Sequence, residues 1–123
     1  MTTIEKIQKQ IANNPILLYM KGSPKFPRCG FSAQAVQAIS ACAERFAYVD
    51  ILQHPDIRAH LPQYAHWPTF PQLWVDTELI GGCDIITEMY QHGELQQIIK
   101  ETTKKYSAVP DDSPQNQAAC CRC

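Results

Sequence analysis

The sequence predicts an α/β domain in which a mixed four-stranded sheet is flanked by helices on both faces. The run Ile16–Met20 is continuously apolar, which is typical of a strand buried on both sides. A helical segment and a second short strand, residues 48–51, follow it, and this order implies a parallel, right-handed crossover. Residues 72–80 are predicted to form an antiparallel hairpin, because two apolar runs flank a two-residue turn.

The first half of the chain alternates helix and strand. Thr2 and Glu5 have the spacing of a capping box, and isoleucines at helical intervals follow them until Pro15 ends the helix. A loop rich in proline separates the first strand from Phe31, where an alanine-rich helix of about four turns is expected to begin. These signals give the order helix, strand, helix, strand.

The second half adds three helices around the hairpin. Pro55 suits the first turn of a helix, and Pro62 predicts a kink or a short final turn in it. Gly82 ends the hairpin, and apolar residues at helical spacing predict two further helices, starting near Ile85 and Leu95.

Length and composition limit the function. The 123 residues predict one domain, 1–106. The composition then becomes polar and loses its apolar periodicity, so we expect residues 107–123 to form a disordered, cysteine-containing tail. Eleven Lys and Arg against twelve Asp and Glu give a net charge of -1, which argues against nucleic-acid binding. No apolar run approaches the roughly 20 residues of a membrane span, and the charged N-terminus argues against export. We expect a cytoplasmic protein without membrane contact.

Cys29 is the strongest candidate for chemistry among the six cysteines. It follows the proline-rich loop and precedes a helix, where free N–H groups and the helix dipole stabilise a thiolate. Lys21 and Arg28 are placed to add positive potential. Cys42 falls on the apolar face of the alanine-rich helix, so we expect it to fill the core.

The cysteines of the tail leave two interpretations open. Cys120, Cys121 and Cys123 could bind zinc or copper, but accidental disulfide formation explains them equally well. The four histidines fit no short metal-binding spacing.

The residues after Cys29 restrict its mechanism. In Cys29-Gly30-Phe31-Ser32 a hydroxyl replaces the second thiol of a C-x-x-C redox pair. A dithiol enzyme resolves its mixed disulfide with that second thiol, which Ser32 cannot do. Either an external thiol completes the reaction, or Cys29 mainly binds a ligand.

Two segments, KGSPKFPRCGFS (21–32) and WPTFPQLWVDTELIGGCD (67–84), resemble those of the monothiol glutaredoxins of the CGFS type, most closely the single-domain bacterial members. The similarity extends from the first helix to about Tyr106 and implies a thioredoxin-like fold. Members of that family hold a [2Fe-2S] cluster between two protomers with two glutathiones, transfer clusters to acceptor proteins in iron–sulfur biogenesis and iron homeostasis, and pair with BolA-like proteins. Thr77 stands where the family commonly has glycine.

The resemblance implies a shared metal site at Cys29. A [2Fe-2S] cluster ordinarily has four thiolate ligands. One active-site thiol from each of two protomers and one from each of two glutathiones supply four, so the loaded protein would be a homodimer.

The resemblance also implies a glutathione pocket. Lys21 and Arg58 would pair with the glycine carboxylate, and a cis proline would leave the backbone of Phe70 free to pair with the tripeptide. Cys83 and Asp84 lead into a helix N-terminus suited to the γ-glutamyl carboxylate, with the Asp84 side chain on the ammonium group. Each of these residues also has a plain structural explanation when taken singly.

Three functions follow from these expectations. The first is a glutathione-dependent carrier of [2Fe-2S] clusters, dimeric when loaded. The second is a thiol–disulfide oxidoreductase, of weak activity, in which Cys29 is the catalytic nucleophile and removes glutathione from mixed disulfides. The third is a regulatory adaptor that acts through its complex with a BolA-like partner. The sequence favours the first.

Overall fold

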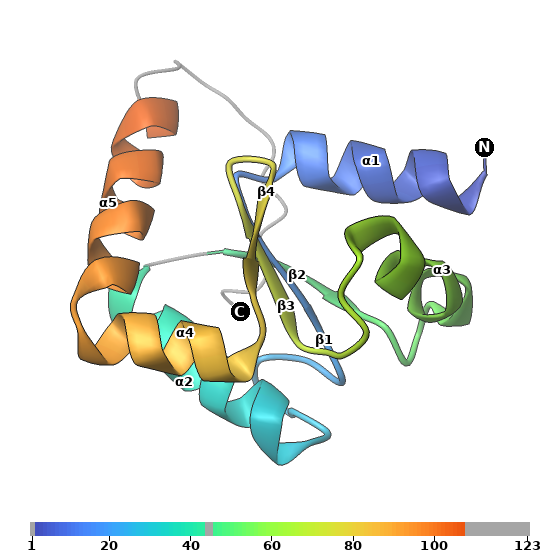
Figure 1. Cartoon of the computed structure of the whole chain (residues 1–123), viewed down its shortest axis with the longest axis horizontal. Helices are drawn as coiled ribbons and strands as arrows, with labels where there is room; N and C mark the ends of the chain where they lie inside the picture. The colour runs from blue at the N-terminus through green and yellow to red at the C-terminus, as the bar shows by residue number, and fades with distance from the viewer. Residues whose placement is uncertain (1, 44–45, 108–123) are drawn as a thin grey trace.

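The computed structural model describes residues 2–43 and 46–107 and has one four-stranded sheet between two groups of helices (Figure 1). The strands are β1 (Ile16–Met20), β2 (Ala47–Asp50), β3 (Gln72–Val75) and β4 (Glu78–Gly81). The helices are α1 (Thr3–Asn13), α2 (Gly30–Cys42), α3 (Pro55–Ala65), α4 (Cys83–Gln91) and α5 (Glu94–Ser107).

The sheet is mixed, as predicted, and its order is β2-β1-β3-β4. Strand β1 pairs in parallel with β2, whereas β1 and β3, and then β3 and β4, pair antiparallel. Leu18 therefore lies between Tyr48 on one side and Leu73 on the other. The two inner strands, β1 and β3, are buried at every residue, which explains the continuous apolar run of β1 and the three apolar residues that follow Gln72 in β3.

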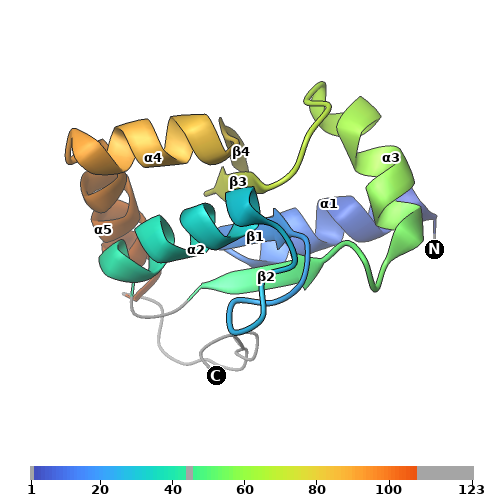
Figure 2. The same ribbon diagram turned by 90° about the horizontal axis from the view of Figure 1, so that it is seen from below.

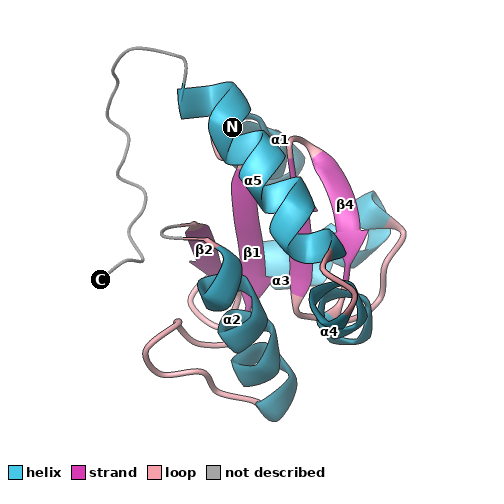
Figure 3. Cartoon of the chain, turned by 90° about the vertical axis from the view of Figure 1, so that its left-hand side faces the viewer, coloured by secondary structure: helices cyan, strands magenta, loops and turns pink. Residues whose placement is uncertain are grey.

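Alternate residues of β1 face opposite helical layers, because side chains alternate along a strand. Leu18 and Met20 belong to the core cluster shared with α2, α4 and α5, while Leu17 and Tyr19 belong to the cluster shared with α1 and α3. Figure 3 shows α2, α4 and α5 in front of the sheet. Burial raises the pKa of Tyr19, and its hydroxyl donates to Gln10 Oε1 at 2.9 Å.

The helix ends follow the sequence signals closely. Thr2 forms the predicted capping box with Glu5 at the start of α1. Helix α3 begins with Pro55 and continues through Pro62 before ending at Ala65, which is the expected short final turn.

Three chain segments converge at one edge of the sheet. The carboxyl ends of β1 and β4 and the amino end of β3 lie at this edge, since β3 runs antiparallel to both neighbours. In Figure 2 the amino ends of α2 and α4 lie side by side there, opposite α3. We call this the cleft edge, because it carries the cleft described below.

Helix α5 ends at Ser107, next to the predicted domain boundary at residue 106, and the division into domain and tail stays a prediction. The predictions for the tail, including those for Cys120, Cys121 and Cys123, lie outside the described residues. Within the described ranges, no helix is long and apolar enough to cross a membrane.

Candidate functional site

A cleft of about 510 Å³ opens at the cleft edge of the sheet. One wall is the loop between α3 and β3, and the opposite wall is the start of α4. All five residues predicted to bind glutathione line it: Lys21, Arg58, Phe70, Cys83 and Asp84. The structure thus brings together side chains that are up to 63 positions apart in the sequence, counted from 21 to 84.

Cys29 lies beside the cleft and is not one of its lining residues. It is the N-cap of α2, and its sulfur accepts the backbone N–H of Ser32 at 3.3 Å. Phe31, two residues after Cys29, does line the cleft, so the Cys29 segment borders the cleft. The prediction that Cys29 sits at a helix N-terminus is therefore confirmed.

Ser32 is the principal contact of the Cys29 thiol. Its side chain is fully buried, its Oγ lies 3.4 Å from Cys29 Sγ, and the same oxygen accepts the backbone N–H of Lys21 at 3.1 Å. A hydroxyl has one hydrogen to donate, so it can turn that hydrogen toward the sulfur once the thiol ionises. The residue that replaces a second thiol thus joins the end of β1 to the start of α2.

The surroundings of Cys29 favour its thiolate. Partial burial raises the pKa of the thiol, but hydrogen bonds from the Ser32 hydroxyl and from the backbone of Ser32 and Phe31 lower it. The positive charge of Lys21 lowers it further, and the pKa of Cys29 falls below its ordinary value. The sequence prediction of a lowered pKa is supported, with Lys21 rather than Arg28 as the contributing charge.

The loop before Cys29 is folded back on itself. Gly22 has φ +92°, and a Cβ atom at this position would lie 2.5 Å from the carbonyl oxygen of Phe26. Ser23 and Phe26 exchange two backbone hydrogen bonds of 3.2 and 3.0 Å. Asp50, at the end of β2, accepts the N–H of Gly22 at 2.9 Å. These contacts fix the approach of the chain to Cys29.

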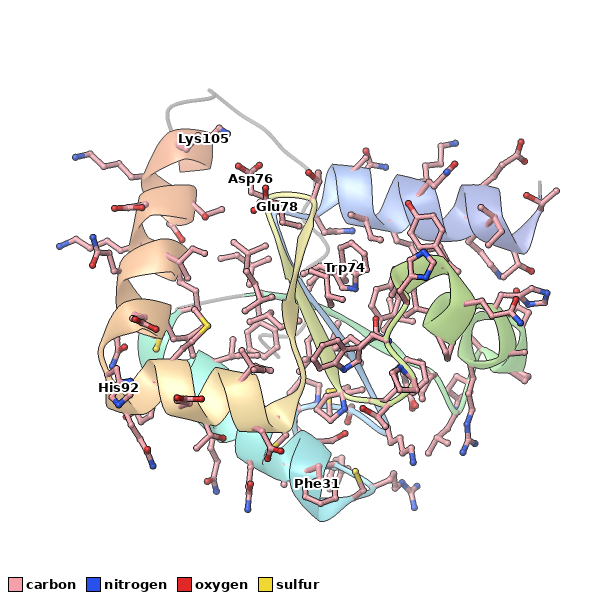
Figure 4. The ribbon with its side chains drawn as sticks, in the orientation of Figure 1. Phe31, Trp74, Asp76, Glu78, His92 and Lys105 are labelled. Carbon is pink, nitrogen blue, oxygen red and sulfur yellow. The ribbon has the colours of Figure 1, made fainter. Side chains whose placement is uncertain are left out.

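Two aromatic side chains near Cys29 are exposed. Phe26 is 71% exposed and Phe31 is 62% exposed, the highest values among the large apolar side chains of the described residues. Figure 4 shows Phe31 at the amino-terminal tip of α2. The thiol therefore has an apolar rim facing solvent.

The loop wall contains the expected cis bond, between Phe70 and Pro71. Trp67 also lines this wall; its Nε1 is buried and has no hydrogen-bond partner within the described part of the chain. The same nitrogen lies 3.3 Å from where a Cβ of Gly82 would stand, so the opposite wall approaches closely because residue 82 is glycine.

The α4 wall is polar at its start. Gly82 is the N-cap of α4, and Asp84 is exposed in the first turn. Cys83 is buried, and its thiol donates to Gln34 Oε1 of α2 at 3.2 Å. The contact between Cys83 and Gln34 joins the two helix starts across the site.

The other described cysteine, Cys42, is half-buried and packs against the core cluster that includes α2, α4 and α5. Burial raises the pKa of its thiol, which disfavours a reactive role. Across residues 2–43 and 46–107, no three His, Cys, Asp or Glu side chains converge to hold a metal ion.

A glutaredoxin family model matches residues 16–80 of the chain. Glutaredoxin 4 of Escherichia coli strain K12 is 78% identical to it over 112 residues, which cover 91% of this chain and 97% of that protein. The chain belongs to the glutaredoxin family. Glutaredoxin 4 of Pasteurella multocida strain Pm70 is 69% identical to this glutaredoxin over 106 residues, covering 86% and 97% of the two chains.

Solved structures agree with this assignment and with the thioredoxin-like fold. Reduced apo GrxS14 of poplar is 40% identical to this glutaredoxin, with a TM-score of 0.71 and coverage of 82% and 93% of the two chains. A monomeric truncated mutant of Trypanosoma brucei 1-C-Grx1 is 30% identical, with a TM-score of 0.72 and coverage of 82% and 91%.

Three features of the site were not predicted from the sequence. They are the hydrogen bond that Asp50 accepts from Gly22 in the Cys29 loop, the exposure of Phe26, and the contact of Gln34 with Cys83. The exposure of Phe26 has a sequence signal, because Phe26 is an aromatic residue in a loop of glycine, proline and charged residues. The two hydrogen bonds join residues from distant elements and carry no local signal.

Proposed function

We propose that this protein is a monothiol glutaredoxin of the CGFS type, which binds a glutathione-ligated [2Fe-2S] cluster between two protomers and transfers it to acceptor proteins. The observation that carries the proposal is the pairing of Cys29 with Ser32. The thiol is accessible and its pKa is lowered, while the position that would hold a resolving thiol holds a buried hydroxyl. This arrangement favours keeping a thiolate available as a ligand.

The number of thiolates supports a shared cluster. Among the cysteines that the structure describes, Cys29 is the one that offers a thiolate, since Cys83 is buried against Gln34 and Cys42 packs against the core. Four ligands are then reached with two protomers and two glutathione thiolates. Glutathione is a structural part of such a site, so assembly requires it.

The cleft beside Cys29 suits glutathione. Lys21 and Arg58 give it positive charge for the glycine carboxylate, and Phe70 offers its backbone to the extended tripeptide. The start of α4, with Gly82 and Asp84, offers backbone N–H groups to the γ-glutamyl carboxylate and a carboxylate to its ammonium group.

The apolar rim suits transfer to a protein partner. Phe26 and Phe31, which come before and after Cys29 in the sequence, are exposed where a second protomer, a BolA-like protein or an acceptor protein would approach. The free thiols suit a reducing compartment such as the cytoplasm.

Anaerobic iron–sulfur reconstitution tests the proposal. We expect a coloured dimer with the visible absorption of a [2Fe-2S] cluster only when glutathione is present. Cys29→Ser should abolish the cluster, and Arg58→Ala should raise the glutathione concentration needed for half-maximal assembly. Cys42→Ser is the matched control and should assemble as the wild type does. A colourless monomer under all conditions would overturn the carrier function.

A glutathione-dependent oxidoreductase is the second candidate, favoured by the lowered pKa of Cys29 next to a cleft of peptide size. The Cys29 thiolate would attack the glutathione sulfur of a mixed disulfide and release the other thiolate. A second glutathione thiolate would then attack the same glutathione sulfur, forming glutathione disulfide and freeing Cys29. Turnover of a glutathionylated peptide without cluster assembly would favour this function.

A further inference from the structure

Gln72 is a fully buried polar residue that lies behind the loop wall of the cleft. It is the first residue of β3, and its side chain is 0% exposed. It does not line the cleft. A buried amide is costly unless its donors and acceptor are satisfied, so its hydrogen bonds show what the residue does.

The Gln72 amide bonds to two backbone carbonyls of the loop. Its nitrogen donates to the carbonyl oxygen of Trp67 at 3.0 Å and to that of Thr69 at 3.3 Å. Both residues line the cleft, together with Pro68 and Phe70 between and after them. One side chain thus fixes two points of the four-residue wall 67–70.

Trp74 fixes the orientation of that amide. Its Nε1 donates to Gln72 Oε1 at 3.2 Å, and an indole nitrogen can only donate. The atom facing Trp74 must therefore be the amide oxygen, which leaves the NH₂ group for the two carbonyls. Trp74 itself lies in the core (Figure 4), and its ring packs at a tilt against Tyr64 of α3, with ring centroids 6.3 Å apart.

The start of the loop is held by α3 independently of Gln72. The backbone N–H of Trp67 donates to the carbonyl oxygen of Pro62 at 3.0 Å. With its carbonyl on Gln72, Trp67 has both backbone groups bonded, and Gln72 also holds the carbonyl of Thr69. The part of the wall nearest Phe70 is therefore the part that Gln72 controls.

We propose that Gln72 is a positioning residue for glutathione: it holds the loop 67–70 in the shape in which Phe70 can pair with the tripeptide. The inference rests on the proposed function, because it takes glutathione as the occupant of the cleft. Gln72 touches no ligand in this scheme and acts only through the Trp67 and Thr69 carbonyls.

The test measures glutathione binding to the full chain by calorimetry. Gln72→Met keeps the length of the side chain and removes its hydrogen bonds, so we expect the dissociation constant for glutathione to rise about tenfold. Trp74→Phe should weaken binding less, and its effect should vanish when Gln72→Met is already present, because both changes act through one amide. Ile99→Val, on the buried face of α5, is the control for a general loss of stability and should leave the dissociation constant unchanged.

A second measurement needs no glutathione. The backbone amide resonances of Thr69 and Phe70 should shift in Gln72→Met and remain in place in Ile99→Val. Unchanged resonances would overturn the positioning role, whatever the binding result. Wild-type protein that binds no glutathione would overturn the proposed function instead, and tight binding by Gln72→Met would overturn this inference alone.

Discussion

The two ends of the sheet are held by different kinds of contact. At the cleft edge, buried or half-buried side chains bond to backbone groups: Ser32 to Lys21, Asp50 to Gly22, and Gln72 to the loop. At the opposite end, an exposed ion pair of 2.8 Å joins Lys105 to Asp76 in the hairpin turn (Figure 4), and the Asp76 N–H donates to the carbonyl oxygen of Pro15 at 2.7 Å.

This difference has an energetic consequence. A buried polar group that loses its partner costs about 1–3 kcal/mol, whereas exposed ion pairs contribute about 0–1 kcal/mol. The cleft edge therefore has a defined shape but tolerates few substitutions, and the hairpin end tolerates many. A binding site needs the defined shape that buried hydrogen bonds give, whereas a chain reversal between two strands does not.

The strongest test of this comparison is Gly22→Ala at the cleft edge. The new Cβ would meet the Phe26 carbonyl and the Arg28 backbone, and φ +92° is unfavourable for alanine. We expect a loss of about 3 kcal/mol in the free energy of unfolding, measured by urea denaturation.

Gly93→Ala is the matched control for Gly22→Ala. Gly93 has φ +78° with no atom within 4 Å of the added Cβ, so it adds the backbone strain without the clash. Its expected cost is about 1 kcal/mol. Equal losses for the two variants would show that the Cys29 loop is not tightly packed.

Ser32→Ala gives the next largest effect. Removing the hydroxyl takes away a hydrogen bond that lowers the pKa of Cys29, so the pKa should rise. At a pH below that pKa, the thiolate fraction falls, and alkylation of Cys29 by iodoacetamide should slow several-fold. The rate against pH, followed by peptide mass spectrometry, measures the change.

The sign of the pH effect on stability follows from the same shift. Because folding lowers the pKa of Cys29, its thiolate stabilises the wild type at high pH, and this contribution is lost as the pH falls through the folded-state pKa. Ser32→Ala should reduce that pH dependence. Ser40→Ala, on the exposed side of α2, should reproduce the wild-type rates; a similar slowing in both variants would contradict the role of Ser32.

Thr77→Gly, at the hairpin end, gives the smallest effect and has the opposite sign. Asp76 and Thr77 have φ +52° and +68°, and a β-branched residue is strained there. Glycine should raise the free energy of unfolding by about 0.5–1 kcal/mol, measured by thermal denaturation. Thr77→Asn should also gain stability, since asparagine tolerates this conformation, and a loss in both would show that the turn is not strained.

The fold was predictable because its signals are local. The apolar run of β1, the capping box at Thr2 and the hairpin turn at Asp76 each depend on neighbouring residues, and the structure confirms all three. The N-cap position of Cys29 was predictable for the same reason. The resemblance to monothiol glutaredoxins added the lining of the cleft, which no local pattern gives.

The rest of the site depends on contacts between elements. The Ser32 hydroxyl meets the Lys21 backbone because α2 packs beside the end of β1. Gln72 meets Thr69 across only three positions, but the contact depends on the loop turning back toward the start of β3 and on the burial of the Gln72 side chain. In the sequence, Gln72 is a polar residue at the start of an apolar strand, and only its complete burial reveals a role. Contacts of this kind are set by how the elements pack together, which the local sequence does not show.

The central strand β1 also determines how the molecule opens. It pairs on both sides, with β2 and β3, and all five of its residues are buried, so its amide hydrogens reach solvent only when the whole domain unfolds. Deuterium uptake in the peptide containing Leu18 is therefore an internal gauge of global stability. Deuterium uptake in another segment, such as the loop 67–70, can be compared with uptake in that peptide. Faster uptake in the loop would report local opening, and equal uptake would report unfolding of the whole domain.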